Sequence, residues 1–150
     1  MSNVFTAYES TIAAVSELKK VEEQTLNTPI KEDAWSIREI IGHMYYWDDY
    51  NLHNMVSQMQ QGANLPAFPD HDTQNEKAIQ SLEGKTVDEI IELFMERRKQ
   101  LLEKIRTVDK NDRFTIGSGK RKFSAESFLK IFTKHDEHHL KQIKDFLAAA

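Results

Sequence analysis

The chain has 150 residues, a formal net charge of −4 and no cysteine. This length predicts a single domain over residues 1–150 with one hydrophobic core. The absence of cysteine excludes a disulfide framework, a thiolate metal site and a cysteine nucleophile, and the interspersed charges leave no basic surface for nucleic acid.

The sequence carries no sign of a membrane partner or of export. Its first nine residues are polar and do not resemble a secretory signal. No segment approaches the roughly 18 to 20 apolar residues needed to span a bilayer. We therefore expect a cytoplasmic protein.

Two long helices are predicted in the first half of the chain. Apolar residues recur at helical spacing from residue 4 to about residue 26, and Pro29 follows as a helix breaker. Ser36 and Glu39 then have the spacing of a capping box, which predicts the start of a second helix. Its apolar stripe continues to Met59, and Gly62 is a suitable C-terminal stop.

The middle of the chain is a long connection. Residues 62–75 contain two prolines among polar residues, which predicts an ordered loop rather than a tight turn. Loops of this length are often functional. A short helix is expected at residues 73–82, ending at Gly84.

The second half of the chain predicts two further long helices. A capping box at Thr86 opens a third helix that reaches about residue 108. Residues 109–122 are polar and predict a small hairpin or an irregular loop. A last helix is expected from residue 124 to about residue 147.

Four amphipathic helices without a convincing strand predict an all-α four-helix bundle. An antiparallel arrangement is the simplest, although the long middle connection also permits the second and third helices to run parallel. Each apolar stripe can be assigned to the internal core.

Histidines are the most informative residues of this chain. His135 and His139 are four residues apart, so they lie on one helix face, and that face continues the apolar stripe. Two imidazoles on a core face are costly unless a metal ion or carboxylates satisfy their nitrogens. His138 lies about 100° away and is expected in solvent.

His43 on the second helix is the third candidate ligand. Imidazoles from facing helices can converge in a bundle core, and three neutral histidines leave an ion its charge and an open position, as in catalytic sites. His53 is almost three turns further on and is a poor fourth ligand. From spacing alone, a histidine pair four residues apart is more often a surface feature or a hydrogen-bonded core pair than a metal site. For His43 by itself, a hydrogen-bonded core histidine is the commoner case.

Aromatic and acidic residues surround the candidate ligands. Trp35 is expected to pack in the core, whereas Trp47 either packs or forms the wall of a pocket, with Tyr50 beside it. Asp48 and Asp136 could hydrogen-bond the ligands from behind. The commoner interpretation of these carboxylates, and of the neighbouring Glu137, is that they are solvated charges.

Two segments of the sequence together resemble the DinB-like superfamily of metal-binding bundles. They are residues 35–43 (WSIREIIGH) with Trp47 and Asp48, and residues 135–143 (HDEHHLKQI). The resemblance extends over essentially the whole chain. It implies an up-down-down-up four-helix bundle, often dimeric, whose metal ligands by position are His43, His135 and His139.

The resemblance also implies a range of activities. Some members of that superfamily are transferases that use a low-molecular-weight thiol such as bacillithiol, and many have no assigned activity. The ion expected here is divalent, with zinc or nickel favoured, although three histidines also suit iron or manganese. A homodimer is expected only by resemblance.

These observations predict a divalent-metal-dependent enzyme that acts on a small molecule, as a hydrolase or as a thiol-dependent S-transferase. A bound ion would lower the pKa of a coordinated water or thiol. Residues 62–75 and 109–124 are the candidate rims of the pocket. Lys120, Arg121 and Lys122 would attract an acidic substrate or form a solvated face.

The sequence leaves two alternative functions open. One is a non-catalytic bundle that binds and sequesters a metal or a small molecule as a means of stress resistance. The other is a helical interaction module whose histidines are only structural.

Overall fold

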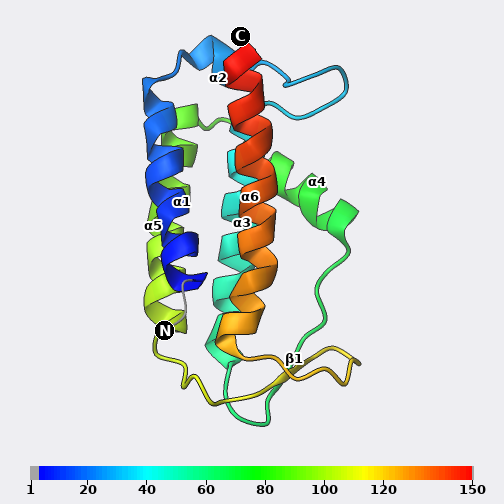
Figure 1. Cartoon of the computed structure of the whole chain (residues 1–150). Coiled ribbons are helices and arrows are strands. Elements are labelled where there is room, and N and C mark those ends of the chain that lie inside the picture. The colour runs from blue at the N-terminus through cyan, green and yellow to red at the C-terminus, as the bar shows by residue number, and fades with distance from the viewer. Residues whose placement is uncertain (1–3, 150) are drawn as a thin grey trace.

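Four long helices form the body of the protein in a computed structural model that describes residues 4–149 (Figure 1). They are α1 (Val4–Ser16), α3 (Ile37–Tyr50), α5 (Val87–Ile105) and α6 (Ala125–Ala149). In Figure 1, α1 and α6 run upward, whereas α3 and α5 both run downward. This arrangement confirms the predicted up-down-down-up bundle, in which the second and third long helices are parallel.

The first predicted helix is shorter than expected. After α1 the chain forms a 3₁₀ turn, η1 (Glu17–Lys20), and then a short helix, α2 (Glu23–Asn27). Val21 between them has an extended backbone, with φ −88° and ψ 144°. The prediction of one helix to residue 26 was therefore wrong, because the chain turns at Val21 and buries Leu26 against the core.

The second predicted helix starts at the expected capping box. The Ser36 hydroxyl accepts a hydrogen bond from the Glu39 backbone, and the Glu39 carboxylate accepts one from the Ser36 N–H at 3.0 Å. Beyond Tyr50 the helix widens into a π-helix, η2 (Asn51–Met55), and ends in a 3₁₀ turn, η3 (Val56–Gln58). It therefore stops four residues before Gly62.

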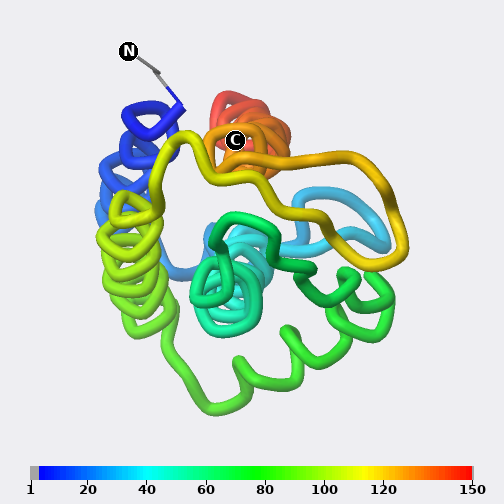
Figure 2. Tube along the Cα trace, turned by 90° about the horizontal axis from the view of Figure 1, so that it is seen from below, coloured from blue at the N-terminus to red at the C-terminus, as the bar shows by residue number. Residues whose placement is uncertain are grey.

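A two-stranded parallel pairing joins the two long loops, which corrects the expectation of no strand. β1 (Asn64–Leu65) pairs with β2 (Thr115–Ile116), and Phe114 forms a separate antiparallel bridge with Phe123. The partners lie about fifty residues apart in the chain, so local sequence patterns did not reveal them. Figure 2, which views the lower end of the bundle, shows the two loops side by side.

The short helix in the middle connection is confirmed. It is α4 (His71–Ser81), which begins two residues earlier than predicted because Asp70 caps it, accepting a hydrogen bond from the Thr73 N–H at 2.9 Å. Figure 1 shows α4 beside the bundle, next to α3.

No helix among residues 4–149 is long and apolar enough to cross a membrane.

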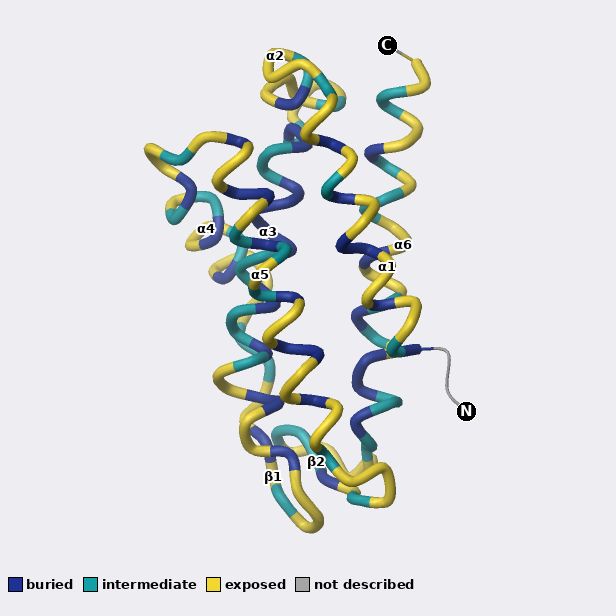
Figure 3. The backbone as a smooth tube through the Cα atoms, turned by 90° about the vertical axis from the view of Figure 1, so that its left-hand side faces the viewer, coloured by how far each residue is buried: buried dark blue, intermediate teal, exposed yellow. Residues whose placement is uncertain are grey.

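The core has two apolar clusters with a polar layer between them. Figure 3 shows the buried residues on the inward faces of the helices. Along α5, Phe94 belongs to one cluster and Leu101 to the other, and the buried Arg98 lies between them. The other three long helices each contribute a buried polar residue that joins Arg98 in this layer, directly or through Asp136, namely Thr11, Asp48 and Asp136.

Candidate metal centre

The polar layer is a buried ion-pair network centred on Arg98. The guanidinium donates to Asp48 Oδ2 and to Asp136 Oδ2, each at 2.7 Å, and stacks on the Tyr8 ring with Cζ 3.5 Å from the ring centroid. The Tyr8 hydroxyl donates to Asp48 Oδ1 at 2.9 Å, and the Thr11 hydroxyl donates to Asp136 Oδ2 at 3.1 Å. All four long helices thus contribute to one network.

The favoured interpretation of Asp48 and Asp136 as solvated charges was wrong. Their exposed fractions are 2% and 5%, whereas Glu137 is exposed as expected. Burial raises the pKa of Asp48 above its ordinary value, although the charge of Arg98 opposes that rise. Without such a cation, burial of the two charged carboxylates would be strongly unfavourable. The charge of Arg98 therefore allows them to lie in the core.

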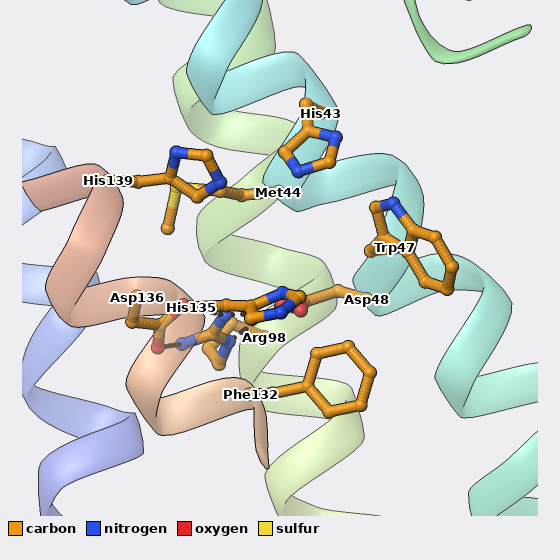
Figure 4. A pocket seen from close by; sticks show the side chains of 9 residues that line it. All are labelled: His43, Met44, Trp47, Asp48, Arg98, Phe132, His135, Asp136 and His139. Atoms are coloured by element: carbon orange, nitrogen blue, oxygen red, sulfur yellow. Dashed lines mark hydrogen bonds and ion pairs between the residues drawn. The ribbon is translucent and has the colours of Figure 1, made fainter. Parts of the chain in front are cut away.

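A small cavity lies against this network. Its volume is about 10 Å³, so it has room for about one water-sized occupant. Figure 4 shows its lining, with three histidine rings facing one space and the network beneath them. The lining residues are His43, Met44, Trp47, Asp48, Arg98, Phe132, His135, Asp136 and His139.

His43 and His139 meet at the upper end of this cavity. Their ring centroids are 5.0 Å apart, with the planes at 74°. Nδ1 of His139 lies 3.0 Å from the side-chain oxygen of Gln142. Because an amide oxygen only accepts hydrogen bonds, Nδ1 carries the proton and Nε2 keeps a free lone pair.

Burial keeps these imidazoles uncharged at neutral pH. It is the largest cause that lowers the pKa of His43 from 6.5 to about 4, and it also lowers the pKa of His135 and His139. Repulsion from His139 lowers the pKa of His43 further. A neutral imidazole is the form that binds a metal ion.

His43 also has an unsatisfied nitrogen. Its side chain is 8% exposed, and its Nδ1 is buried without a hydrogen-bond partner. The Asn75 side chain approaches the ring and raises the pKa of His43, against the larger effect of burial, without completing a bond to Nδ1. The sequence had left open that His43 is a hydrogen-bonded core histidine. At Nδ1 the structure shows no such hydrogen bond.

His135 stands at the rim of the cavity. It is exposed, and its ring packs edge-on against Phe132 with the centroids 5.5 Å apart. Among residues 4–149, no three histidine, aspartate or glutamate side chains are arranged to hold a metal ion as they stand. The fold thus brings the rings of His43 and His139 together and places His135 beside them.

The other predicted residues have varied positions. Trp47 lines the cavity, and Tyr50 contacts the Trp47 ring at 5.9 Å without lining it. Trp35 is half-buried and packs on His43 at 5.0 Å, as expected for a core aromatic residue. His138 is exposed, as expected, and His53 is exposed too.

Sequence reasoning missed two residues of α4 that lie near the site. The Asn75 side-chain oxygen accepts a hydrogen bond from the Trp47 indole at 3.4 Å, and the His71 ring lies 5.5 Å from the Trp47 ring. Repulsion from His71 contributes to the lowered pKa of both His43 and His135. The thin apolar pattern of this segment had left His71 in a loop with no indicated neighbour.

Comparisons with solved structures agree with this architecture. The chain is similar to YfiT from Bacillus subtilis, described as a probable metal-dependent hydrolase with an unusual four-helix bundle topology, with a TM-score of 0.71 and 16% identity over 96% of this chain and 83% of that one. It is also similar to TT2238, a four-helix bundle protein, with a TM-score of 0.63 and 16% identity over 95% of this chain and 97% of that one. At these identities the likeness concerns the fold alone.

Comparison with curated proteins found no match. The family model of the DinB superfamily, in contrast, matches residues 6–143, which include His43, His135 and His139. The match covers most of the chain and includes all four long helices, so this protein belongs to the DinB superfamily.

Proposed function

We propose that this protein is a divalent-metal-dependent hydrolase acting on a small molecule, with His43, His135 and His139 as its metal ligands. The observation that carries the proposal is the pairing of His43 and His139, two neutral imidazoles from different helices, at a cavity of about 10 Å³ that His135 also lines. YfiT, which has the same fold, is described as a probable metal-dependent hydrolase.

The donor set fits a divalent ion in three respects. The imidazoles are uncharged at neutral pH, Nε2 of His139 is free, and the network beneath them has one positive and two negative groups. A net negative charge close below the cavity favours a cation there. The exposed His135 would have to turn from Phe132 toward the other two rings, which its position at the rim allows.

An ion held there would act as a Lewis acid and make a water or a thiol nucleophilic near neutral pH. The protein's own groups have separate roles. Gln142 would fix the orientation and tautomer of His139, and the Arg98 network would hold α3, α5 and α6 in register below the ligands. Trp47 and Phe132 form an apolar wall, with their rings 6.2 Å apart, that excludes water from one side.

Zinc or nickel is the expected ion, and the expected substrate is a small molecule. A low-molecular-weight thiol as second substrate, as in the thiol-dependent transferases of this superfamily, would use the same ion. The chain has no thiol of its own, so the two reactions differ only in the external nucleophile. A cytoplasmic location and a homodimer remain part of this proposal.

The test is elemental analysis of untagged protein, before and after it is offered zinc and nickel. We expect roughly one equivalent of metal per chain, lost in His139→Ala and retained in His138→Ala. His138 is a suitable control because it is exposed and is the neighbouring residue on α6. Hydrolysis of ester and amide panels, with and without added thiol, then separates the two reactions.

Absence of metal from the wild-type chain under all conditions would contradict the proposal. Metal that is bound without turnover in any assay would instead support the non-catalytic, sequestering alternative. Equal metal content in His139→Ala and wild type would show that the ligands lie elsewhere.

A further inference from the structure

The cavity is too small to hold a substrate. Its volume of about 10 Å³ suits a single ion or water, so a substrate must approach from the side on which the cavity opens. α3, α5 and α6 supply all the lining residues, whereas α4 contributes none and packs on α3 beside them. Residues of α4 are therefore candidates to contact a substrate that is bound over the ion.

Two contacts between α4 and Trp47 place α4 beside the site. The Trp47 indole donates to Asn75, and the Trp47 ring contacts the His71 ring edge-on at 80°. Since Trp47 itself lines the cavity, His71 is one side chain removed from it. The electrostatic effect of His71 on both His43 and His135 agrees with this position.

Neither helix capping nor hydrogen bonding accounts for the placement of His71. Asp70, not His71, caps the helix, since its carboxylate accepts from both the backbone and the hydroxyl of Thr73 at 2.9 Å. The His71 side chain is exposed. Within residues 4–149 the structure gives its ring nitrogens no hydrogen-bond partner, so they are available to a ligand.

We propose, building on the proposed function, that His71 is a further catalytic residue, which donates a hydrogen bond from its imidazole to an oxygen of the bound substrate. The substrate class that fits is a small molecule with an acceptor oxygen, such as a carboxylate or carbonyl compound, because an imidazole N–H donates only to an acceptor. His71 is not itself a metal ligand in this arrangement.

The experiment uses Co²⁺-loaded protein and acetate as the probe of the open coordination position, followed by the visible absorption of the metal. We expect His71→Ala to weaken acetate binding about tenfold, the size of one hydrogen bond to a charged group. Co²⁺ affinity should stay within about threefold of wild type, since no ligand is removed. His71→Gln keeps an N–H donor and should lose less acetate affinity.

His53→Ala is the matched control, because it removes an exposed imidazole that is bound to Asp49 and lies away from the cavity lining. Unchanged acetate affinity in His71→Ala would overturn the inference. Co²⁺ affinity that falls more than about tenfold would also overturn it, because His71 would then be a ligand. A wild-type chain that binds neither Co²⁺ nor zinc or nickel would overturn the proposed function, and this inference with it.

Discussion

At the scale of single residues, the site depends on how each imidazole is held. The Nδ1 atom of His139 is held by the side chain of Gln142, which lies three residues away on the same helix, α6. Groups that hydrogen-bond a metal-binding histidine from behind set its tautomer and its orientation. Gln142 was part of the family-like motif, but nothing in its spacing indicated this role.

Replacement of Gln142 should weaken metal binding without unfolding the protein. Gln142→Leu removes the oxygen that holds the His139 ring, so metal affinity should fall about 10- to 100-fold in a chelator competition titration. Gln142→Glu keeps an acceptor oxygen at the same place and should retain affinity. Wild-type affinity in Gln142→Leu would show that the bond to His139 is unimportant.

Protonation of His43 should couple the stability of the metal-free protein to pH. The folded chain holds the pKa of His43 at about 4, below its ordinary value of 6.5, so the unfolded chain binds the proton more tightly. The contribution to stability is therefore complete above about pH 6.5 and is lost as pH falls toward about 4, by about 3 kcal/mol at most.

Urea unfolding across this pH range measures the effect, with His43→Asn as the comparison. The variant cannot take up this proton, so its free energy of unfolding should fall less steeply with decreasing pH. Taking the difference between the two proteins removes contributions from other groups, including Asp48, whose raised pKa acts in the opposite direction. Equal pH slopes for both proteins would contradict the prediction.

At the scale of elements, the contact of α3 with Leu82, at the C-terminal end of α4, positions α4 relative to the site. Gly42 precedes His43, and a Cβ added there would lie 2.3 Å from Leu82 Cδ1 and 2.9 Å from Leu82 Cγ. Leu82 is itself 1% exposed and cannot easily move away. Arg38 reinforces the junction by donating to the Leu82 carbonyl at 2.6 Å.

Gly42→Ala should therefore destabilise the protein, although alanine favours a helix. Overpacking costs about 1–3 kcal/mol, more than the roughly 1 kcal/mol that alanine gains over glycine in a helix. Thermal unfolding measures the loss. The double variant Gly42→Ala, Leu82→Ala should lose less than the sum of the two single variants, and strict additivity would show that the two residues do not clash.

At the scale of the whole molecule, the Arg98 network holds four helices in one register. Each of the other three long helices supplies a partner of Arg98, which is 1% exposed. A buried cation between two carboxylates is costly to assemble and more costly to leave incomplete. The network therefore specifies how the helices align more than it adds to stability.

Loss of the Arg98 charge should be among the most damaging single changes in the chain. Arg98→Met leaves Asp48 and Asp136 buried without their cation, which costs about 3–5 kcal/mol in urea unfolding. Arg97→Met is the matched control, since Arg97 forms its ion pair with Asp49 nearer the surface and should cost about 0–1 kcal/mol.

Restoring neutrality should recover much of that loss. The triple variant Arg98→Met, Asp48→Asn, Asp136→Asn removes the buried charges together, so no uncompensated charge stays in the core and the loss should be smaller than in Arg98→Met. A triple variant as unstable as Arg98→Met would mean that packing of the guanidinium on Tyr8, rather than charge, is what the core requires.

Local patterns determined the long helices of this protein and the candidate residues of its site. Capping boxes at Ser36 and Thr86, together with apolar periodicity, located the long helices because both signals act within a few residues. Helical spacing also placed His135 and His139 on one face. Arg98 was detectable by the same logic, since it interrupts the apolar stripe of α5 between Phe94 and Leu101.

Only the tertiary structure decided which residues contact one another across the bundle. The parallel pairing of β1 with β2, the burial of Asp48 and Asp136 around Arg98, and the approach of α4 to Trp47 all join segments far apart in the chain. Such contacts depend on how the helices pack, which no local pattern encodes. The sequence by itself therefore determined which residues are candidates for the site, and the packing of the helices decided that His43 meets His139 and that His71 lies near them.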